Sequence, residues 1–185
     1  MKGTGLKVMR KQNLLRFFGV LVFAGAIVGF METGSGNDSK GESEMTEVKR
    51  LKKSDDQWKE ILPSDRFRIL FKEGTEPAGS SPLNHEKRPG TFICAACYQP
   101  LFKSGTKFDS GTGWPSFYDH ISGSLETSLD FKLIYPRTEY HCSRCGGHQG
   151  HVFKDGPPPT GKRFCNNGLA LIFVPDGEPF PELRD

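Results

Sequence analysis

The chain has 185 residues, enough for one domain of ordinary size together with a leader. Hydrophobic residues make up 35% and charged residues 25% of it, as in a soluble globular protein, and fifteen Phe indicate aromatic packing in the core. Five of the 25 basic residues lie in the first 31 residues, which lack Asp and Glu, so 20 basic face 22 acidic residues in the remainder. A nearly neutral domain offers no basic face for nucleic acid, which we exclude as a partner.

The first segment, residues 1–31, is typical of an export signal. Residues 17–31 form an uncharged run of 15 residues after a basic cluster, and residues 24–26 (AGA) offer a small-residue cleavage site. A buried core helix is the alternative, but a polar segment follows the run rather than a domain. The run is shorter than the about 20 residues of a membrane span, although a tilted, uncleaved helix over residues 14–31 could cross as a tether. We expect a signal peptide or membrane anchor and an exported protein that is periplasmic, membrane-anchored or secreted.

The next segment, residues 32–47, consists largely of Gly, Ser, Glu, Asp and Lys and predicts a flexible linker, because it cannot bury enough apolar surface to fold. The domain then begins near Val48. Residues 54–57 form a capping-box pattern that opens a short helix through Leu62. Residues 63–65 (PSD) begin a second short helix, which we expect to end at Gly74.

Beyond Gly90 the pattern indicates short antiparallel strands. Runs rich in Phe, Ile, Val, Tyr and Thr alternate with clusters of Gly, Pro, Asn and Ser, which is not the pattern of repeated βαβ units. We therefore expect a mainly β domain over residues 48–175, with short N-terminal helices and a C-terminal tail of residues 176–185.

Four of the five cysteines form two C-x-x-C knuckles, Cys94 with Cys97 and Cys142 with Cys145, separated by 44 residues. Four thiolates so arranged can close a tetrahedral Zn²⁺ site, because a two-residue spacer lets each turn aim both sulfurs at one ion. Two disulfides are the alternative, since an exported protein meets an oxidising compartment. We expect zinc, because both knuckles lie on turns beside strand-like runs and not at a helix start, as a thioredoxin-type motif requires. With four protein ligands the zinc would be structural.

The fifth cysteine, Cys165, is a buried hydrophobe, an intermolecular disulfide partner or a reactive thiol. Arg163 and Asn167 stand two residues before and after it, so in a strand the three side chains project from one face. A nearby guanidinium favours the thiolate, and an amide supplies donors. His148 and His151 follow the second knuckle and could supply protons at neutral pH. Structural roles for both histidines and a surface role for Arg163 stay open, because spacing does not establish that His148 meets Cys165.

A long ordered series of motifs carries more specific information. It comprises Trp58, residues 74–76 (GTE), the first knuckle, residues 107–117 (KFDSGTGWPSF), residues 137–139 (RTE), the second knuckle, residues 150–157 (GHVFKDGP) and residues 160–167 (TGKRFCNN). The series runs from about Val48 to Phe173 and resembles the B-type methionine sulfoxide reductases, also called the SelR domain. The resemblance favours a catalytic Cys165 over the other interpretations.

The resemblance implies reduction of methionine R-sulfoxide, free or in oxidised proteins or peptides, on two twisted antiparallel β-sheets with the structural four-cysteine zinc site far from the reacting thiol. It implies that Cys165, a thiolate favoured by Arg163, attacks the sulfoxide sulfur and becomes a sulfenic acid. By the same resemblance His148, His151 and Asn167 would position the sulfoxide oxygen and deliver its proton.

Trp114 would form the wall against which the substrate methyl group packs, again by the resemblance. From the sequence alone, Trp114 is better explained as a core aromatic between two turns. The physical requirement is general: a sulfoxide oxygen leaves poorly until it is protonated, so an acid must lie beside it while the thiolate approaches sulfur.

Three positions depart from the family pattern. Thr112 stands where many members have a resolving cysteine, so we expect an external thiol, thioredoxin-like or small, to reduce the sulfenic acid. Gln149 replaces the usual Leu between the histidines, and residues 168–170 (GLA) replace a small polar run. The last two changes bear on substrate preference and rate. We further expect a monomer that maintains methionines of exported proteins under oxidative stress.

Other classes of function stay open on the residues alone. A zinc-ribbon interaction module would depend on the knuckles and not on Cys165. A zinc deaminase is disfavoured, because its H-x-E and P-C-x-x-C signature is missing. A cysteine hydrolase or peroxidase would be separated by a substrate assay.

Overall fold

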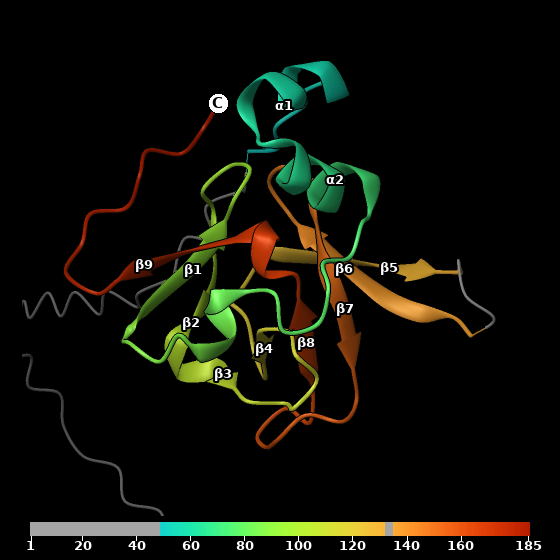
Figure 1. Ribbon diagram of the computed structural model, residues 1–185, viewed down its shortest axis with the longest axis vertical. Coiled ribbons are helices and arrows are strands. Elements are labelled where there is room, and N and C mark those ends of the chain that lie inside the picture. Colours follow the sequence, from blue (N-terminus) through green and yellow to red (C-terminus); the bar gives the residue numbers. More distant parts are fainter. Residues whose placement is uncertain (1–48, 132–134) are drawn as a thin grey trace, which may run out of the picture. The chain divides into compact units, whose positions relative to one another are not determined.

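The structure, a computed structural model, describes residues 49–131 and 135–185 (Figure 1). They belong to one compact unit, Glu44–Asp185. The expected leader (1–31) and linker (32–47) lie outside the described residues. Within the described part of the chain, no helix has the length and apolar character needed to cross a membrane.

Two short helices precede the sheets, as predicted. Helix α1 spans Asp55–Ile61, and its capping box is present, with the Ser54 hydroxyl accepting from the Gln57 amide and the Gln57 side chain accepting from the Ser54 amide. Helix α2 spans Ser64–Lys72. It ends earlier than predicted, because Glu73 and not Gly74 adopts the left-handed conformation, at φ 50°.

The strands form two antiparallel sheets, which confirms the predicted fold class. The three-stranded sheet has the order β2-β1-β9, and the six-stranded sheet has the order β3-β4-β8-β7-β6-β5. The strands are β1 Gly90–Cys94, β2 Pro100–Lys103, β3 Lys107–Phe108, β4 Ser116–Phe117, β5 Leu125–Asp130, β6 Arg137–Cys142, β7 His148–Phe153, β8 Arg163–Asn166 and β9 Leu171–Pro175. Three 3-10 turns complete the fold: η1 Pro82–His85 lies between α2 and β1, η2 Ser104–Thr106 between β2 and β3, and η3 Gly168–Ala170 between β8 and β9.

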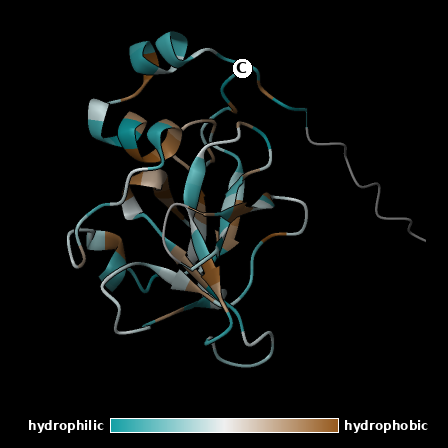
Figure 2. Ribbon diagram, turned by 90° about the vertical axis from the view of Figure 1, so that its right-hand side faces the viewer, coloured by the Kyte–Doolittle hydropathy of each residue, from teal (hydrophilic) through white to brown (hydrophobic). Residues whose placement is uncertain are grey.

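Aromatic side chains fill the core, as the Phe content indicated. Phe102 stacks on Phe117 with ring centroids 4.2 Å apart, and Phe92 meets Phe117 edge-on at 4.9 Å. Tyr140 of β6 packs against Phe164 of β8 at 5.3 Å. Helix α2 carries both polar and apolar residues (Figure 2) and buries three of its apolar side chains: Phe67, Ile69 and Leu70.

A β-bulge in β7 orients the residues that follow the second knuckle. Tyr140 pairs with Gly150 and the adjacent His141 pairs with His148, so Gln149 is the extra residue. In a regular strand, two residues three positions apart point to opposite faces. Here the imidazole rings of His148 and His151 lie 5.5 Å apart, because the bulge returns both to the same side.

Candidate active site and cysteine cluster

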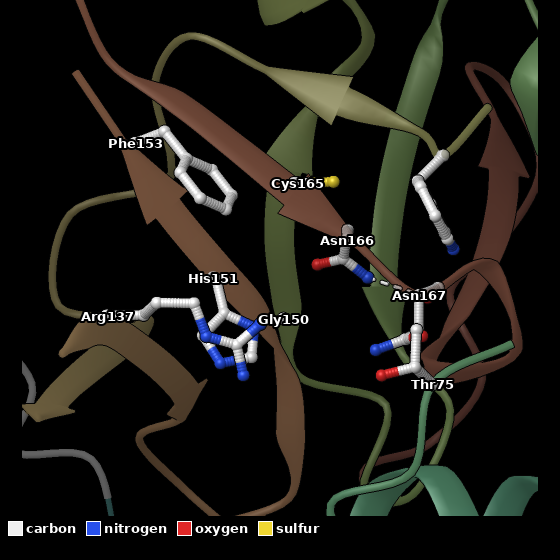
Figure 3. A pocket seen from close by; sticks show the side chains of 9 residues that line it. Thr75, Arg137, Gly150, His151, Phe153, Cys165, Asn166 and Asn167 are labelled. Atoms are coloured by element: carbon white, nitrogen blue, oxygen red, sulfur yellow. Dashed lines mark hydrogen bonds between the residues drawn. The ribbon is translucent and has the colours of Figure 1, made fainter. Parts of the chain in front are cut away.

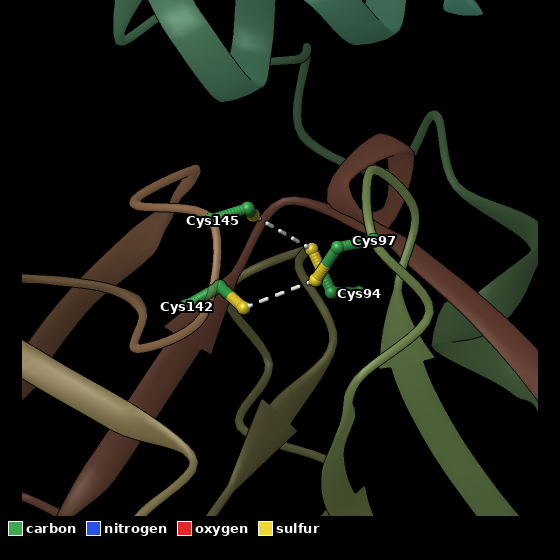
Figure 4. A group of neighbouring side chains, drawn as sticks. All are labelled: Cys94, Cys97, Cys142 and Cys145. Carbon is green, nitrogen blue, oxygen red and sulfur yellow. Dashed lines mark hydrogen bonds between the residues drawn. The ribbon is translucent and has the colours of Figure 1, made fainter. Parts of the chain in front are cut away.

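The four knuckle cysteines meet as one buried group, which we call the cysteine cluster (Figure 4). Its sulfur atoms all lie within 4.8 Å of one another. The Sγ atoms of Cys94 and Cys145 are 3.7 Å apart and those of Cys97 and Cys142 are 3.5 Å apart, so all four are free thiols and not disulfides. Such a cluster can hold a metal ion.

Burial and hydrogen bonds shift the pKa values of two cluster thiols in opposite directions. Burial raises the pKa of the Cys94 thiol, whereas hydrogen bonds from the other three cysteines lower the pKa of Cys97. The bulged Gln149 reaches the cluster, and its side-chain Nε2 lies 3.5 Å from Cys94 Sγ. Its Oε1 is buried without a hydrogen-bond partner. A cation at the centre would stabilise all four sulfurs as thiolates.

The C-terminal residues hold the two knuckles together. The Arg144 guanidinium donates to the carbonyls of Cys97 at 3.2 Å and of Arg184 at 2.6 Å. Arg184 in turn lies over the Tyr98 ring at 4.1 Å and donates to the Ala96 carbonyl at 3.0 Å. These contacts hold the end of the chain against the two turns that carry the cysteines.

Cys165 lies in a separate cavity of about 140 Å³ (Figure 3). Its sulfur is part of a surface that combines aromatic rings with polar groups. The lining residues are Thr75, Trp114, Arg137, Gly150, His151, Phe153, Cys165, Asn166 and Asn167. Trp114, His151, Cys165 and Asn167 were expected in the site from the sequence, and the structure brings these four together.

Strand register aligns the polar groups beside Cys165. His151 of β7 lies directly opposite Cys165 of β8, and Glu139 of β6 lies directly opposite His151. Residues opposed in neighbouring strands project on the same face of a sheet. The sheet therefore presents a carboxylate, an imidazole and a thiol in one row.

Each histidine of the bulge is held by a carboxylate. His151 Nε2 donates to Asp130 Oδ2 at 2.9 Å, and Arg137 donates to the same oxygen at 2.6 Å. His148 Nδ1 donates to Glu139 Oε1. Burial lowers the pKa of His148 to about 4 and also lowers that of His151, although the carboxylates act in the opposite direction. Both rings are therefore neutral at pH 7. His148 is not part of the cavity lining but lies behind His151.

Arg163 also lies outside the lining, where it is engaged by two neighbours. It forms a two-pronged ion pair with Asp155, with both N–O distances 2.9 Å, and its guanidinium lies 4.3 Å from the centre of the Phe153 ring. Burial raises the pKa of the Cys165 thiol, while Arg163 and the Thr112 hydroxyl lower it. Arg163 thus acts in the direction expected from the sequence, but burial has the larger effect.

Glu76 supports the far wall of the cavity. Its carboxylate is buried and accepts from the amides of Gly168 and Leu169. Its amide donates to Asn167 Oδ1 at 3.1 Å, and its carbonyl accepts from the Trp114 indole at 3.1 Å. The Asn167 side chain also donates to the Gln149 carbonyl at 3.1 Å. One residue therefore fixes Trp114 and Asn167 together.

Several residues of the site were not singled out from the sequence. They are Thr75, Glu76, Asp130, Arg137, Glu139 and Phe153. All of them except Asp130 lie within motifs that carried the family resemblance, and this was the available signal. Their contacts depend on strand register and on long-range pairing, which spacing does not give.

Comparison with known proteins agrees with this geometry. The sequence matches the SelR domain over residues 62–175. The chain belongs to the SelR domain family. This confirms the resemblance found from the motifs.

Three relatives of this SelR-domain chain are all named as methionine sulfoxide reductases. "Peptide methionine sulfoxide reductase MsrB" of Methanosarcina barkeri is 48% identical over 131 residues, which cover 70% of this chain and 92% of that protein. The protein of the same name from Agrobacterium fabrum is 45% identical over 134 residues, or 72% of this chain and 98% of that one. "Methionine-R-sulfoxide reductase B3, mitochondrial" of Mus musculus is 49% identical over 111 residues, or 60% of this chain and 44% of that one.

Proposed function

We propose that this chain reduces methionine R-sulfoxide in oxidised proteins or peptides to methionine, with Cys165 as the nucleophile. The observation that most supports this proposal is the cavity that contains the Cys165 thiol. Cys165 lies opposite His151, which is hydrogen-bonded to a carboxylate, and beside Trp114. Family membership supports the same reaction, since the relatives are named as peptide methionine sulfoxide reductases.

The proposed reaction transfers the thiol proton to the substrate oxygen and leaves Cys165 with one oxygen atom. Because burial raises the Cys165 pKa, the resting sulfur carries its proton. The neutral His151 accepts this proton as the sulfur attacks the sulfoxide sulfur, and passes it to the sulfoxide oxygen. The attack forms a bond between Cys165 Sγ and the substrate sulfur, and the protonated oxygen leaves as hydroxide when the S–O bond breaks. Hydroxide then attacks Cys165 Sγ and breaks the new S–S bond. The substrate sulfur leaves as the thioether, reduced by two electrons, and Cys165 is oxidised by two electrons to sulfenic acid.

Neighbouring side chains orient His151 for this proton transfer. Asp130 fixes the His151 ring and stabilises the imidazolium that forms when the ring takes the proton. His148 contacts His151 edge-to-face, and Glu139 fixes the His148 ring. We propose that His148 helps to position the sulfoxide oxygen indirectly, through its contact with His151.

Asn167 and Arg163 complete the proposed polar machinery. The Asn167 amide lines the cavity and orients the oxygen of the substrate. Arg163 lowers the pKa of Cys165 and so promotes loss of its proton, while Asp155 keeps the guanidinium in place.

Aromatic rings supply the proposed substrate wall. Trp114 is held by its indole hydrogen bond to the Glu76 carbonyl, and Phe153 is held beneath the Arg163 guanidinium. A methyl group that packs on Trp114 leaves the oxygen directed at His151 in only one hand of the chiral sulfoxide. We infer selectivity for the R epimer from this arrangement.

Regeneration needs a thiol from outside the chain. Among the five cysteines, four form the cysteine cluster, and Thr112 occupies the position beside Cys165 from which a thiol could attack. We propose that a thioredoxin-like or small-thiol donor attacks the sulfenic acid, releasing water and forming a mixed disulfide, which a second thiol of the donor resolves.

We propose structural zinc for the cysteine cluster. Four sulfurs placed about 2.3 Å from a tetrahedral Zn²⁺ lie about 3.8 Å apart, close to the 3.5 and 3.7 Å separations between the knuckles. The residues present fit this ion. Four protein ligands leave no position for water, so the ion would tie the knuckles together and take no part in the reaction.

Residues 1–31 bear on where the reaction takes place. We propose that they direct export, with cleavage or retention as a tether, and that the domain works as a monomer repairing methionines of exported proteins. Fractionation of cells with antibody against the chain tests this, since recovery in the cytosol would contradict it. Size-exclusion chromatography with light scattering tests the monomer.

The reaction is tested with separate R and S epimers of a methionine sulfoxide peptide and a dithiol reductant. We expect turnover of the R epimer alone, at least a 1,000-fold loss in Cys165→Ser and no loss in Ser128→Ala, an exposed control on β5. Metal content and circular dichroism should be the same in all three proteins. Absence of turnover with the metal bound would instead favour an interaction module.

A further inference from the structure

A second group of metal-ligating side chains lies apart from the cysteine cluster. Glu139, His141 and His148 offer ligand atoms that all lie within 4.8 Å of one another. Both imidazoles direct a nitrogen at the same carboxylate oxygen: His148 Nδ1 bonds to Glu139 Oε1, and His141 Nε2 lies 3.1 Å from it. Glu139 and His148 are buried, whereas the His141 side chain is 21% exposed.

We propose that Glu139, His141 and His148 bind a divalent transition-metal ion, such as Ni²⁺, and that this ion inhibits the reductase. Two imidazole nitrogens and one carboxylate oxygen on one side of an ion suit Ni²⁺, Co²⁺ or Zn²⁺ and leave the other positions to water. The all-sulfur cluster suits Zn²⁺, whereas this donor set also suits Ni²⁺, so Ni²⁺ can be offered to this site while zinc occupies the cluster.

The backbone already places the three ligands. Glu139 and His141 stand two residues apart on β6 and therefore share a face, and His141 pairs directly with His148 across the β6–β7 ladder. The bulge at Gln149 sets His148 on that same face. An ion placed among these atoms would replace the two contacts to Glu139 Oε1, and the three ligands would adjust by side-chain movement alone.

Solvent reaches this group through a surface hollow of about 370 Å³. Three of its lining residues carry carboxylates, and no described Lys or Arg belongs to the lining. Arg137, which is not among the lining residues, pairs with Asp130. The lining residues are Glu73, Ser128, Leu129, Asp130, Phe131, Glu139 and His141. The hollow gives an ion a route from solvent to Glu139 and His141.

The inhibitory part of the inference rests on the proposed function. An ion on Glu139 and His148 would remove the hydrogen bond that orients the His148 ring. His148 contacts His151, which lies opposite Cys165, so the ion would disturb the proton path without entering the substrate cavity. Inhibition should be reversed by a chelator and should lower kcat more than it raises KM.

Binding is tested by calorimetric titration of NiCl₂ into the full chain with its cysteine cluster loaded with zinc, in a Cys165→Ser background that removes the reactive thiol. We expect one Ni²⁺ per chain without release of zinc, read with a chromogenic chelator. Affinity should fall at least tenfold in His141→Ala and stay unchanged in His85→Ala, a matched control on η1. His141→Gln, which keeps a polar partner for Glu139, provides a second variant should His141→Ala fail to fold.

Equal Ni²⁺ affinity in His141→Ala and His85→Ala, or no binding at all, would overturn the site. The second arm adds NiCl₂ to the wild-type reductase, where we expect at least a tenfold loss of rate that His141→Ala escapes while keeping its basal activity. Binding without inhibition would retain the site and overturn its link to the reaction. A chain that binds Ni²⁺ but never turns over would locate the failure in the proposed function instead.

Discussion

The five cysteines occupy two regions that differ in what surrounds the sulfur. In the cysteine cluster, each sulfur is buried among three others and against the main chain of two turns. Cys165 is partly exposed, lies on a strand and faces a row of ionisable side chains. The first environment favours four thiolates around one ion, and the second favours proton transfer to and from one thiol.

The comparison teaches that burial alone does not decide reactivity. Burial raises the pKa of both Cys94 and Cys165. A metal ion can hold Cys94 as a thiolate, whereas Cys165 relies on His151 and Arg163 to lose its proton. The four predictions that follow separate these two arrangements, beginning with the largest effect.

Loss of one cluster ligand should unfold the domain. Structural zinc contributes about 10–16 kcal/mol in small zinc-binding peptides, as much as or more than the about 5–15 kcal/mol by which most domains are stable. Cys142→Ala, or removal of the metal with a chelator, should therefore abolish the near-ultraviolet circular dichroism and the cooperative thermal transition. Cys165→Ser should retain both. A folded, metal-free Cys142→Ala protein would show that the cluster is dispensable.

Acid should destabilise the fold through His148. Its pKa is lowered from 6.5 to about 4 by burial, so the unfolded chain takes up the proton first as the pH falls. The contribution is fully present above pH 6.5 and is lost between pH 6.5 and 4, with a size of about 3 kcal/mol. Urea unfolding of wild type and His148→Gln across this range measures it. Parallel pH dependences of the two proteins would exclude His148 as the source.

The wall of the cavity should loosen when Glu76 loses its charge. Glu76→Gln turns an amide toward the backbone donors of Gly168 and Leu169, which should cost about 2 kcal/mol of unfolding free energy. Because Trp114 and Asn167 depend on the same residue, kcat/KM should fall by about 10-fold to 100-fold. Glu60→Gln, exposed on α1, serves as control and should change neither quantity. Full activity in Glu76→Gln would refute the positioning role.

The smallest effect is expected at the bulge. Gln149→Leu removes a weak donor to Cys94 and a buried unpartnered oxygen together, so the stability change should stay within about 1 kcal/mol. Metal affinity, measured by competition with a chelator, should fall a few-fold, with little change in turnover. Gln99→Leu provides the contrast, because it removes two buried hydrogen bonds, to the Ser124 carbonyl and the Ser143 hydroxyl, and should cost about 1–3 kcal/mol. Equal costs in the two variants would contradict this reasoning.

Local chemistry explains what could be predicted from the sequence. The capping box of α1 and the two knuckles are encoded within a few residues, and both were predicted correctly. The end of α2 was misplaced, because Gly74 is the usual residue for a left-handed cap but Glu73 takes that conformation here. A Cβ on Gly74 would lie 3.0 Å from the Arg68 carbonyl oxygen, so the glycine permits a close approach instead.

The carboxylates of the site could not be predicted, because they depend on how distant segments pair. Asp130 and Glu139 reach the histidines only through the register of β5, β6 and β7. Alternation along β7 would have separated His148 from His151, and nothing in the order of residues marks Gln149 as the bulge. The partners of the expected residues came from the fold rather than from spacing.

The hydrogen bonds of Glu76 also set an order in time. They join residues 91 to 93 positions apart, so the cavity wall closes only when both ends of the domain are present. Glu76 is synthesised first, and it can form these hydrogen bonds only after Asn167, Gly168 and Leu169 have been added. Contacts of such long range are slow to form, because the loop entropy is lost before they stabilise the fold. A nascent chain therefore contains the residues of both helices long before it can form a competent reaction site.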